Sequence, residues 1–351
     1  MPQLIYEFNS PNGVVKNKNI SHSSRLILSE VEKYGVEWRI IPCTQLIELN
    51  YKGDIQAFYH QVPSSTSALA KYSCNNKMVT TNLLFSHDIC VPKGFRVKRE
   101  TSKEDLQLYY KNLHKPLVVK PSDGSLGENI TININTYDKY LNSIEYALEY
   151  TGKENATVIV EEMFDGTEYR VLATREKVLG VLYRRPASIL GNGKDSIKQL
   201  IKEKNSHPIR SLKKGTCSHL KIRMDSRMSK YLEEQGLDFN SIPKNDQRVY
   251  LRKVSNISQG GDAIDFTDKV HSSVKEIALK AINAVPGLSF AGIDFLSKDI
   301  TKKQKKGTYI IIEINDSPGF DIHDYPYEGK NRHTAREFLF LMYPELQKIK
   351  V

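Results

Sequence analysis

The stretch FAGIDFLSKDITKKQKKGTYIIIEIN (Phe290–Asn315) contains two apolar runs separated by a lysine-rich turn. Both runs have the composition of buried strands, and the lysines between them indicate a solvated hairpin tip. Asp294 lies in the first run, and Glu313 and Asn315 lie in the second. Charged groups inside apolar strands are costly unless they are paired or bind a cation. The hairpin therefore predicts a functional site as well as a pair of strands.

Asp294, Glu313 and Asn315 form a set of hard oxygen ligands. Glu313 and Asn315 are two positions apart, so their side chains leave the same face of one strand. Two carboxylates and an amide oxygen suit a Mg²⁺ ion that also holds phosphate oxygens. The alternative is that each group ends a strand and meets solvent. That alternative accounts for any one of the three more easily than for all of them together.

A second strand, VVKP (118–121), leads into the glycine-bearing loop SDGSLG (122–127). Lys120 ends this strand, where a buried cation needs a partner such as a phosphate. The loop, which includes Ser125, can lay backbone N–H groups over a polyphosphate. In a Walker phosphate loop the lysine follows the glycines, so these phosphate contacts must belong to another architecture. The loop alone is a weak signal, because any glycine turn looks similar.

The stretch VIVEEMFDGTEYR (158–170) joins a strand to another turn. A strand that runs into a linker can offer main-chain N–H and C=O groups to an adenine edge, here at Glu161–Phe164. Glu168, which follows the turn, could bind ribose hydroxyls. The alternative is a hairpin with surface charges, which explains Glu162 better than it explains the whole set.

The remaining sequence indicates mixed helices and strands. Residues 1–115 are consistent with a small α/β lobe whose last helix ends near His87. A helix begins at a cap-like Asp195 or Ser196, and a stronger helical repeat over 270–285 stops at Pro286-Gly287. At 351 residues the chain can hold two or three packed subdomains.

Several classes of protein are excluded by composition. No run approaches the roughly 18 apolar residues that span a bilayer, and the N-terminus lacks the pattern of a signal peptide. The four cysteines show no CxxC spacing, so zinc or a disulfide framework is not expected. We therefore expect a cytoplasmic protein without a membrane partner.

The formal net charge is +10, which raises nucleic acid as a partner. The densest basic stretch, Arg210–Lys230, has no interleaved aromatic residues that would stack on single strands. An anionic small molecule needs positive potential just as much. We therefore do not expect nucleic acid, and we expect this stretch to help bind a substrate with more than one negative charge, with a solvated helix and loop as the alternative.

The order of these motifs resembles the ATP-grasp superfamily: Lys77 in NNKMVTTNLL, VVKP with its glycine loop, EEMFDGTEYR, GIDF and EIN. Three longer segments (160–205, 251–268 and 313–332) are similar to cyanophycin synthetase, and still more to the ATP-grasp part of bifunctional glutathione synthetases. The resemblance covers roughly residues 75 to 347. Residues 1–70 match only as a generic preceding lobe.

The resemblance implies an α+β fold in which two subdomains grip ATP. The expected domains are an N-terminal α/β lobe with a linker helix (1–115), a small subdomain (116–190) and a large subdomain (191–351). The implied activity is that of an ATP-dependent carboxylate–amine ligase that joins amino acids or small peptides through an acyl phosphate and releases ADP and phosphate. Relatives are often dimers or tetramers, so a homo-oligomer is expected.

The resemblance also assigns roles to residues. ATP would be held by Lys77, Lys120, Ser125, Glu161, Glu162, Met163, Phe164 and Glu168. Two Mg²⁺ ions, for which Mn²⁺ can substitute, would be held by Asp294, Glu313 and Asn315. Phosphate or substrate would be bound by Arg170, Arg185, Asn256, Gly260, Gly261 and His323. Lys120 and Arg252 would be catalytic, with Arg252 facing the tetrahedral oxyanion. Arg184 is expected to hold a surface salt bridge.

Two other functions stay open at this point. One is a nucleotide-binding protein that kept the fold without catalysis. The other is an ATP-grasp kinase that releases a phosphorylated product without capturing an amine. The retention of Lys120 and of the three oxygen ligands favours the ligase over the first of these. Phosphate release with and without candidate amines separates the ligase from the kinase.

Overall fold

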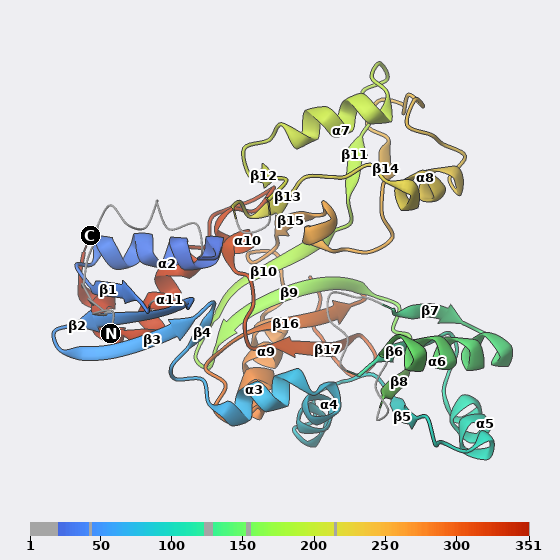
Figure 1. Ribbon diagram of the computed structural model, residues 1–351, viewed down its shortest axis with the longest axis horizontal. Coiled ribbons are helices and arrows are strands. Elements are labelled where there is room, and N and C mark those ends of the chain that lie inside the picture. Colours follow the sequence, from blue (N-terminus) through green and yellow to red (C-terminus); the bar gives the residue numbers. More distant parts are fainter. Residues whose placement is uncertain (1–19, 42–43, 123–128, 152–155, 214–215, 351) are drawn as a thin grey trace, which may run out of the picture.

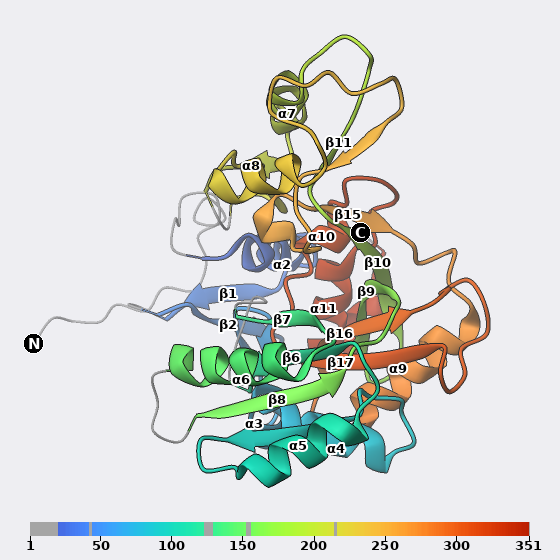
Figure 2. The same cartoon turned by 90° about the vertical axis from the view of Figure 1, so that its right-hand side faces the viewer.

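The computed structural model of the chain describes residues 20–41, 44–122, 129–151, 156–213 and 216–350. Figures 1 and 2 show four parts: an N-terminal lobe, a central sheet, a small subdomain at one end of that sheet, and an outer subdomain that projects from it. Helices and mostly antiparallel sheets occur together, which confirms the predicted α+β class.

The N-terminal lobe is a four-stranded antiparallel sheet covered by helices. Its strands pair in sequence order: β1 (Glu37–Ile40), β2 (Leu46–Tyr51), β3 (Asp54–Tyr59) and β4 (Val62–Pro63). The helices α2 (His22–Lys33) and α11 (Thr334–Met342) contact each other, and the last turn η2 (Pro344–Lys348) follows. Phe58 of the sheet meets Phe338 of α11 at 5.6 Å between ring centroids. The C-terminal helix therefore completes the core of the N-terminal lobe.

The small subdomain is a four-stranded sheet with the order β5-β8-β6-β7. It comprises β5 (Gly94–Lys98), α5 (Lys103–Asn112), β6 (Leu117–Pro121), β7 (Thr131–Ile134), α6 (Tyr137–Thr151) and β8 (Thr157–Glu162). The fully buried Tyr140 of α6 packs in the core that this sheet shares with α6. All of its strand pairs are antiparallel.

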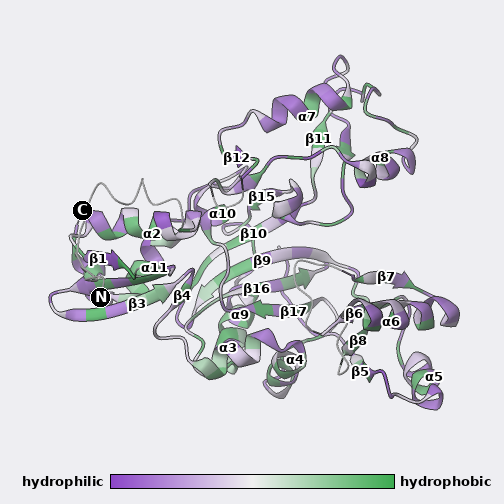
Figure 3. Cartoon of the chain, in the orientation of Figure 1, coloured by the Kyte–Doolittle hydropathy of each residue, from purple (hydrophilic) through white to green (hydrophobic). Residues whose placement is uncertain are grey.

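The central sheet has five antiparallel strands in the order β15-β10-β9-β16-β17. These strands are β9 (Thr167–Thr174), β10 (Val178–Arg185), β15 (Asp262–Asp265), β16 (Phe290–Ser297) and β17 (Tyr309–Asn315). One face is apolar and packs against α3 (Ala68–Asn75), α4 (Lys77–Ser86) and α9 (Ser272–Ala284). Figure 3 shows the hydrophobic colouring along the strands of this sheet. The opposite face carries the charged residues of the candidate site.

The outer subdomain (residues 188–251) has a small core of its own. It comprises β11 (Ser188–Leu190), α7 (Ile197–Asn205), β12 (Arg210–Ser211), β13 (His219–Leu220), α8 (Ser226–Glu233) and β14 (Arg248–Tyr250). Ser196 and Gln199 form a capping box at the start of α7, which decides between the two predicted caps in favour of Ser196. The short helix η1 (Ile257–Gln259) lies between β14 and β15 in the sequence. The short helix α10 (Asp321–Asp324) contacts β10 and β15 of the central sheet and also α2 and α11.

The expected boundaries after residues 115 and 190 do not coincide with the limits of the sheets. Strand β5 pairs with β8 and so belongs to the small subdomain, although it precedes residue 116. Strands β9 and β10 belong to the central sheet, although they precede residue 191. Pairing between distant segments, which no local pattern reveals, sets these boundaries. None of the helices in the described ranges is long and apolar enough to cross a membrane.

Candidate active site

The strand register brings the predicted oxygen ligands onto one face of the central sheet. Asp294 of β16 lies opposite Glu313 of β17 on one side and opposite Arg170 of β9 on the other. Residues directly opposite each other in a sheet share a face. Asn315 follows Glu313 by two positions and therefore leaves the same face. We call the face that carries these residues, with Glu168 and Arg184, the polar face.

A β-bulge determines that Glu313 belongs to the polar face. Asp294 pairs with Glu313, but the next residue of β16, Phe295, pairs with Ile311, so that Ile312 is an extra residue in β17. Ile311 packs in the apolar core on the other side of the sheet. Without the bulge, strict alternation would place Ile311 and Glu313 on the same face. The bulge thus turns the end of β17 so that its carboxylate meets Asp294.

Asp294 is 5% exposed and lies between two arginines. Arg170 Nε approaches Asp294 Oδ1 at 2.8 Å, and Arg184 Nη2 approaches the same oxygen at 3.3 Å. These contacts are ion pairs without hydrogen-bond geometry, because Oδ1 accepts no hydrogen bond from the described residues. A Cβ atom at Gly292 would lie 2.7 Å from Arg170 Nη1, so the glycine of GIDF makes room for this guanidinium.

The residues present fit a magnesium ion. Asp294 and Glu313 lie opposite each other on neighbouring strands and offer the hard carboxylate oxygens that Mg²⁺ prefers, and Arg170 and Arg184 also pair with Asp294 Oδ1. Glu313 is partly exposed, and Asn315 donates from its amide nitrogen to the Gly292 carbonyl at 3.5 Å, which leaves the amide oxygen to a ligand. No group of three His, Cys, Asp or Glu side chains within the described ranges could hold a metal. The predicted set contains only two carboxylates, and its third member, Asn315, is an amide.

Lys77, predicted to contact ATP, lies next to the predicted metal ligands. It is the first residue of α4, whose N-terminus is capped by the Asn76 side chain. Its Nζ lies 3.4 Å from Glu313 Oε1. The structure thus brings together a cation and a carboxylate that the sequence placed far apart.

The roles expected for Arg184 and Arg185 are reversed in the structure. Arg184 was expected at the surface, but it pairs with Glu168 and approaches Asp294 on the polar face. Arg185 was expected to face substrate, but it pairs with Asp262 and Glu328 instead. Neighbouring residues of a strand point to opposite faces, so only one of the two arginines can reach the site. Arg184 is therefore a site residue that the sequence interpretation missed.

Glu168, predicted to bind ribose, connects the polar face to the loop of residues 252–261, hereafter the substrate loop. Ser255 Oγ of this loop donates to Glu168 Oε2 at 2.9 Å. Asn256 accepts from the backbone of Ser258 and caps η1, and the N–H of Gly261 returns to the Asn256 carbonyl at 3.2 Å. These contacts give the loop a defined shape beside the polar face. Ser255 was not singled out from the sequence.

Gly260 and Gly261 are required by the backbone of the substrate loop. Gly260 has a φ of +93°, and a Cβ atom there would lie 2.8 Å from Ile222 Cγ1. A Cβ atom at Gly261 would lie 2.9 Å from the Arg185 carbonyl oxygen. Side chains would therefore strain the loop and displace its neighbours. This packing explains both glycines without a substrate.

Arg252, the predicted partner of the oxyanion, is held by the outer subdomain. Its Nη1 donates to Asp225 Oδ1 at 2.9 Å, and its Nη2 donates to the Arg223 carbonyl at 3.2 Å. Asp225 also caps α8, and its pKa is lowered mainly by the hydrogen bond from Arg252. The described contacts of Arg252 thus join it to α8 and not to the carboxylates of the polar face.

Two residues of the small subdomain that were predicted to bind ATP form a nearly buried ion pair. Lys120 pairs with Glu161, and the two side chains are 10% and 12% exposed. They leave the same face of neighbouring strands β6 and β8. Ser125 lies outside the described residues. Lys120 therefore has a partner within the protein in addition to any phosphate.

The expected adenine linker is partly engaged by the protein itself. The N–H of Met163 donates to the Pro116 carbonyl at 2.9 Å, and the N–H of Glu162 donates to the Lys93 carbonyl at 2.9 Å. The Glu162 side chain accepts from the N–H of His114 at 3.0 Å, which agrees with the surface-hairpin alternative for this residue. The Phe164 ring packs over Gly166, where a Cβ atom would lie 2.6 Å from it.

His323, predicted to touch substrate, is fully buried beside β10. A Cβ atom at Gly180 would lie 2.6 Å from its Nδ1, and neither ring nitrogen has a hydrogen-bond partner within the described ranges. Burial, and then the charge of Arg170, lower the pKa of His323 to about 3. The ring offers no exposed atom to a substrate in this conformation. The predicted contact is therefore not supported.

A second buried histidine, His219, predicts how stability depends on pH. Its Nε2 accepts from the N–H of Ala263 at 3.0 Å, and burial followed by the charge of Arg210 lowers its pKa to about 3. An unfolded histidine titrates near pH 6.5, so the contribution of His219 is complete above that pH and is lost as the pH falls towards 3. The slope for one proton is about 1.4 kcal/mol per pH unit.

Between pH 4 and 6, we expect the His219→Gln variant to take up about one proton fewer on unfolding than wild type does. Glutamine can still accept from Ala263 through its side-chain oxygen, which limits the structural damage. Urea unfolding at a series of pH values measures the slope, with His114→Gln as a control because His114 is exposed. An unchanged slope in His219→Gln would show that His219 is not held neutral in the fold.

Comparison with solved structures identifies the fold. A bifunctional glutathione synthetase from Pasteurella multocida matches with a TM-score of 0.76 and 30% sequence identity, over 93% of this chain and 44% of its own. The chain has the ATP-grasp fold, and the resemblance to ATP-grasp carboxylate–amine ligases is confirmed. No protein-family model matches the chain.

The relatives by sequence are of the two kinds that the motifs indicated. A glutathione biosynthesis bifunctional protein from Clostridium perfringens is 35% identical over 96% of this chain and 42% of its own length. A cyanophycin synthetase from Trichormus variabilis is 30% identical over 96% of this chain and 36% of its own length. The matches extend through most of the first 70 residues, which corrects the expectation of a merely generic lobe. The chain spans about two fifths of the length of these relatives.

Proposed function

We propose that this chain is an ATP-dependent ligase that joins a carboxylate to an amine through an acyl phosphate, with amino acids or small peptides as substrates. The observation that carries the proposal is the polar face, where the buried carboxylate of Asp294 pairs with Arg170 and Arg184 and lies opposite Glu313. Oxygen ligands and guanidinium groups on one face suit a phosphoryl group and a substrate carboxylate held together. The relatives named above support this class of reaction.

The polar face supplies the charges that phosphoryl transfer needs. Asp294, Glu313 and Asn315 would hold two Mg²⁺ ions, for which Mn²⁺ can substitute; bound Mg²⁺ neutralises charge on phosphate oxygens. Lys77 and Lys120 would contact ATP phosphates, and the Phe164 backbone and the Met163 carbonyl would face adenine. The Met163 N–H is already donated to Pro116.

The reaction has two steps. An oxygen of the substrate carboxylate attacks the γ-phosphorus, and ADP leaves. The amine then attacks the carbonyl carbon and loses a proton, and phosphate leaves with the oxygen that it received. The tetrahedral oxyanion needs a cationic partner. We assign that role to Arg184 in place of Arg252, because Arg184 lies on the polar face beside Asp294, whereas the described contacts of Arg252 join it to α8.

Both alternatives to the ligase are distinguished by one experiment. Purified protein is incubated with ATP, Mg²⁺ and amino acids or dipeptides, singly and in pairs, and ADP release is followed. A ligase releases ADP strongly only when an acid and an amine are both present. A kinase is fully active with the acid alone, and a binding protein releases no ADP with any pair. Size-exclusion chromatography tests the proposed dimer or tetramer.

A further inference from the structure

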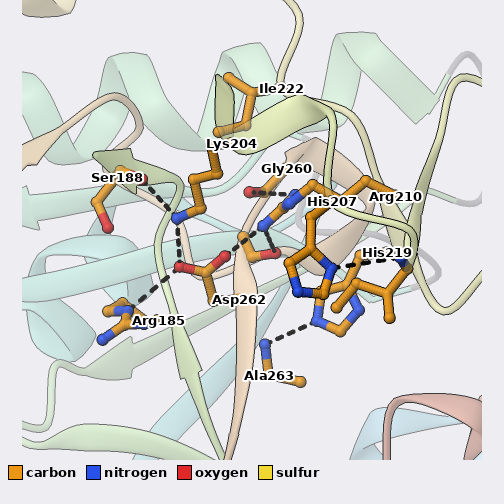
Figure 4. Close-up of polar contacts among 12 residues, drawn as sticks. Arg185, Ser188, Lys204, His207, Arg210, His219, Ile222, Gly260, Asp262 and Ala263 are labelled. Atoms are coloured by element: carbon orange, nitrogen blue, oxygen red, sulfur yellow. Dashed lines mark hydrogen bonds and ion pairs between the residues drawn. The ribbon is translucent and has the colours of Figure 1, made fainter. Parts of the chain in front are cut away.

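A buried charge cluster joins the outer subdomain to the central sheet (Figure 4). Its centre is Asp262, the first residue of β15, which is fully buried and directly follows the substrate loop. Three cations from three segments surround its carboxylate. Arg185 of β10 lies at 3.3 Å, Lys204 of α7 lies at 2.7 Å, and Arg210 of β12 donates to Oδ1.

The Arg210 side chain binds backbone carbonyls of the substrate loop. Its fully buried guanidinium donates from Nη1 to the carbonyls of Leu220 at 2.7 Å and Gly260 at 3.2 Å, and from Nη2 to the Gly261 carbonyl at 3.5 Å. The fork of a guanidinium can hold several carbonyls and a carboxylate at once, which an ammonium cannot do in the same geometry. Arg210 therefore fixes the two glycines for which side chains are excluded.

Lys204 ties the same carboxylate to the start of the outer subdomain. Its Nζ donates to the Ser188 carbonyl at 2.6 Å as well as to Asp262. The ring of Tyr327 covers the cluster, with Lys204 Nζ at 4.8 Å from its centroid. Strand β11, helix α7 and the substrate loop are thus held by one buried group.

Burying the charges of this cluster has a large desolvation cost, which points to a role other than stability. Desolvating several charges costs more than their pairing returns in many proteins, and such groups are retained in some systems because they specify one arrangement. Burial lowers the pKa of Lys204 to about 8 against the opposing effect of Asp262. A hydrophobic contact would join the subdomains at lower cost. Charged groups add directed bonds to the loop carbonyls, which a hydrophobic contact cannot make.

The substrate loop in turn reaches the polar face. Ser255 donates to Glu168, and Glu168 pairs with Arg184, which approaches Asp294. A continuous series of polar contacts therefore runs from the outer subdomain through the loop to the proposed site of phosphoryl transfer. Arg210 holds the loop at Gly260 and Gly261, and Glu168 holds it at Ser255.

We propose that Arg210 and Asp262 are positioning residues that hold the substrate loop in the shape that receives the acid substrate. Only the binding of the acid substrate rests on the proposed function. The ordering of the loop by Arg210 and Asp262 is independent of it. It also changes the interpretation of the basic stretch 210–230. The first residue of the stretch, Arg210, binds backbone carbonyls, and its buried charge pairs with Asp262.

The test measures loop order first, without any substrate. Amide hydrogen exchange of the full-length protein is followed by mass spectrometry for wild type, Arg210→Lys, Arg210→Met and Asp262→Asn. Lysine keeps the charge near Asp262 but cannot reproduce the fork. We expect exchange in residues 252–262 to rise about tenfold or more in Arg210→Lys, and further in Arg210→Met, while the strands of the N-terminal lobe are unchanged.

A matched control removes another buried ion pair of the same strand. Arg332 pairs with Asp265 at the other end of β15 and makes no described contact with the substrate loop. Arg332→Met should lower stability without loosening residues 252–262. Equal exchange in Arg210→Lys and wild type, or an equal loosening of the loop in Arg332→Met, would overturn the proposal.

Activity provides the second measurement. With an acid–amine pair found by the screen described above, Arg210→Lys should raise the KM for the acid about tenfold or more, while the KM for ATP changes less than about twofold. A loosened loop with an unchanged KM for the acid would contradict the positioning role. If no pair is turned over, the proposed function fails, and the exchange result still decides whether Arg210 orders the loop.

Discussion

Replacing Asp294 by asparagine or Glu313 by glutamine lowers ATP turnover by about 100-fold or more. Each change keeps the shape of the side chain and removes one negative ligand from the pair that meets across β16 and β17. Electrostatic contributions at phosphoryl sites reach several kcal/mol, which corresponds to this loss of rate. ADP release is measured at saturating ATP over a series of Mg²⁺ concentrations, and the loss should be largest at low Mg²⁺.

The control for this prediction lies in the same hairpin. Asp299 is at its tip, where it accepts from the backbone and side chain of Thr301, away from the polar face. Asp299→Asn should keep turnover within about twofold of wild type. Circular dichroism and urea unfolding show whether each variant is folded, since Asp294 also pairs with two arginines. Turnover near the wild-type level in both Asp294→Asn and Glu313→Gln at low Mg²⁺ would contradict the metal assignment.

The second large effect concerns Lys120. Lys120→Met leaves the carboxylate of Glu161 nearly buried without its partner, and breaking such a pair costs about 3 kcal/mol. If Lys120 also binds ATP, its loss raises the KM for ATP about tenfold. Glu161→Gln and the double variant separate the two roles. The double variant should recover much of the stability, because no buried charge is left unpaired, but it should retain the raised KM.

An exposed ion pair of the same subdomain serves as the control. Lys98 and Glu100 lie 3.2 Å apart, with side chains 50% and 71% exposed. Removing that pair should leave the free energy of unfolding close to that of wild type, because solvent screens exposed ion pairs. If the double variant of Lys120 and Glu161 binds ATP as wild type does, the lysine is only a structural partner of Glu161. In that case the phosphate contacts come from elsewhere in the site.

Local patterns in the sequence were sufficient to predict the strands and helices that build the site. The runs that became β16 and β17 were read correctly as a hairpin, and the helix near residues 270–285 was found as α9. The two-residue spacing of Glu313 and Asn315 correctly placed them on one face. The meeting of that face with Asp294 depends on the bulge at Ile312, which the apolar run IIIEIN does not reveal.

Residues whose roles depend on the tertiary arrangement were harder to place. Arg184 and Arg185 are chemically identical, and only the register of β10 shows which one reaches the polar face. Arg210 lies in a basic stretch whose composition is typical of exposed residues, but its side chain is buried against Asp262. The contact requires that two segments 52 positions apart meet. Nothing in either segment alone specifies the other.

The arrangement of the domains also depends on long-range packing. Helix α11 follows the central sheet in the chain, and it was expected in the large subdomain. It packs with α2 and with Phe58 as well as against Phe290 of the central sheet, so its apolar side belongs to the core that the N-terminal lobe shares with that sheet. The amphipathic pattern predicts a buried side for such a helix but not the surface that covers it.

The central claim is that the carboxylate is activated as an acyl phosphate and then captured by an amine. Labelling the carboxylate of the acid with ¹⁸O, in a pair that the screen identifies, tests this claim most directly. The account predicts that each amide formed is accompanied by one ADP and by one inorganic phosphate that carries a single ¹⁸O atom, seen by mass spectrometry. Amide formation with unlabelled phosphate, or label that appears in AMP, would contradict it.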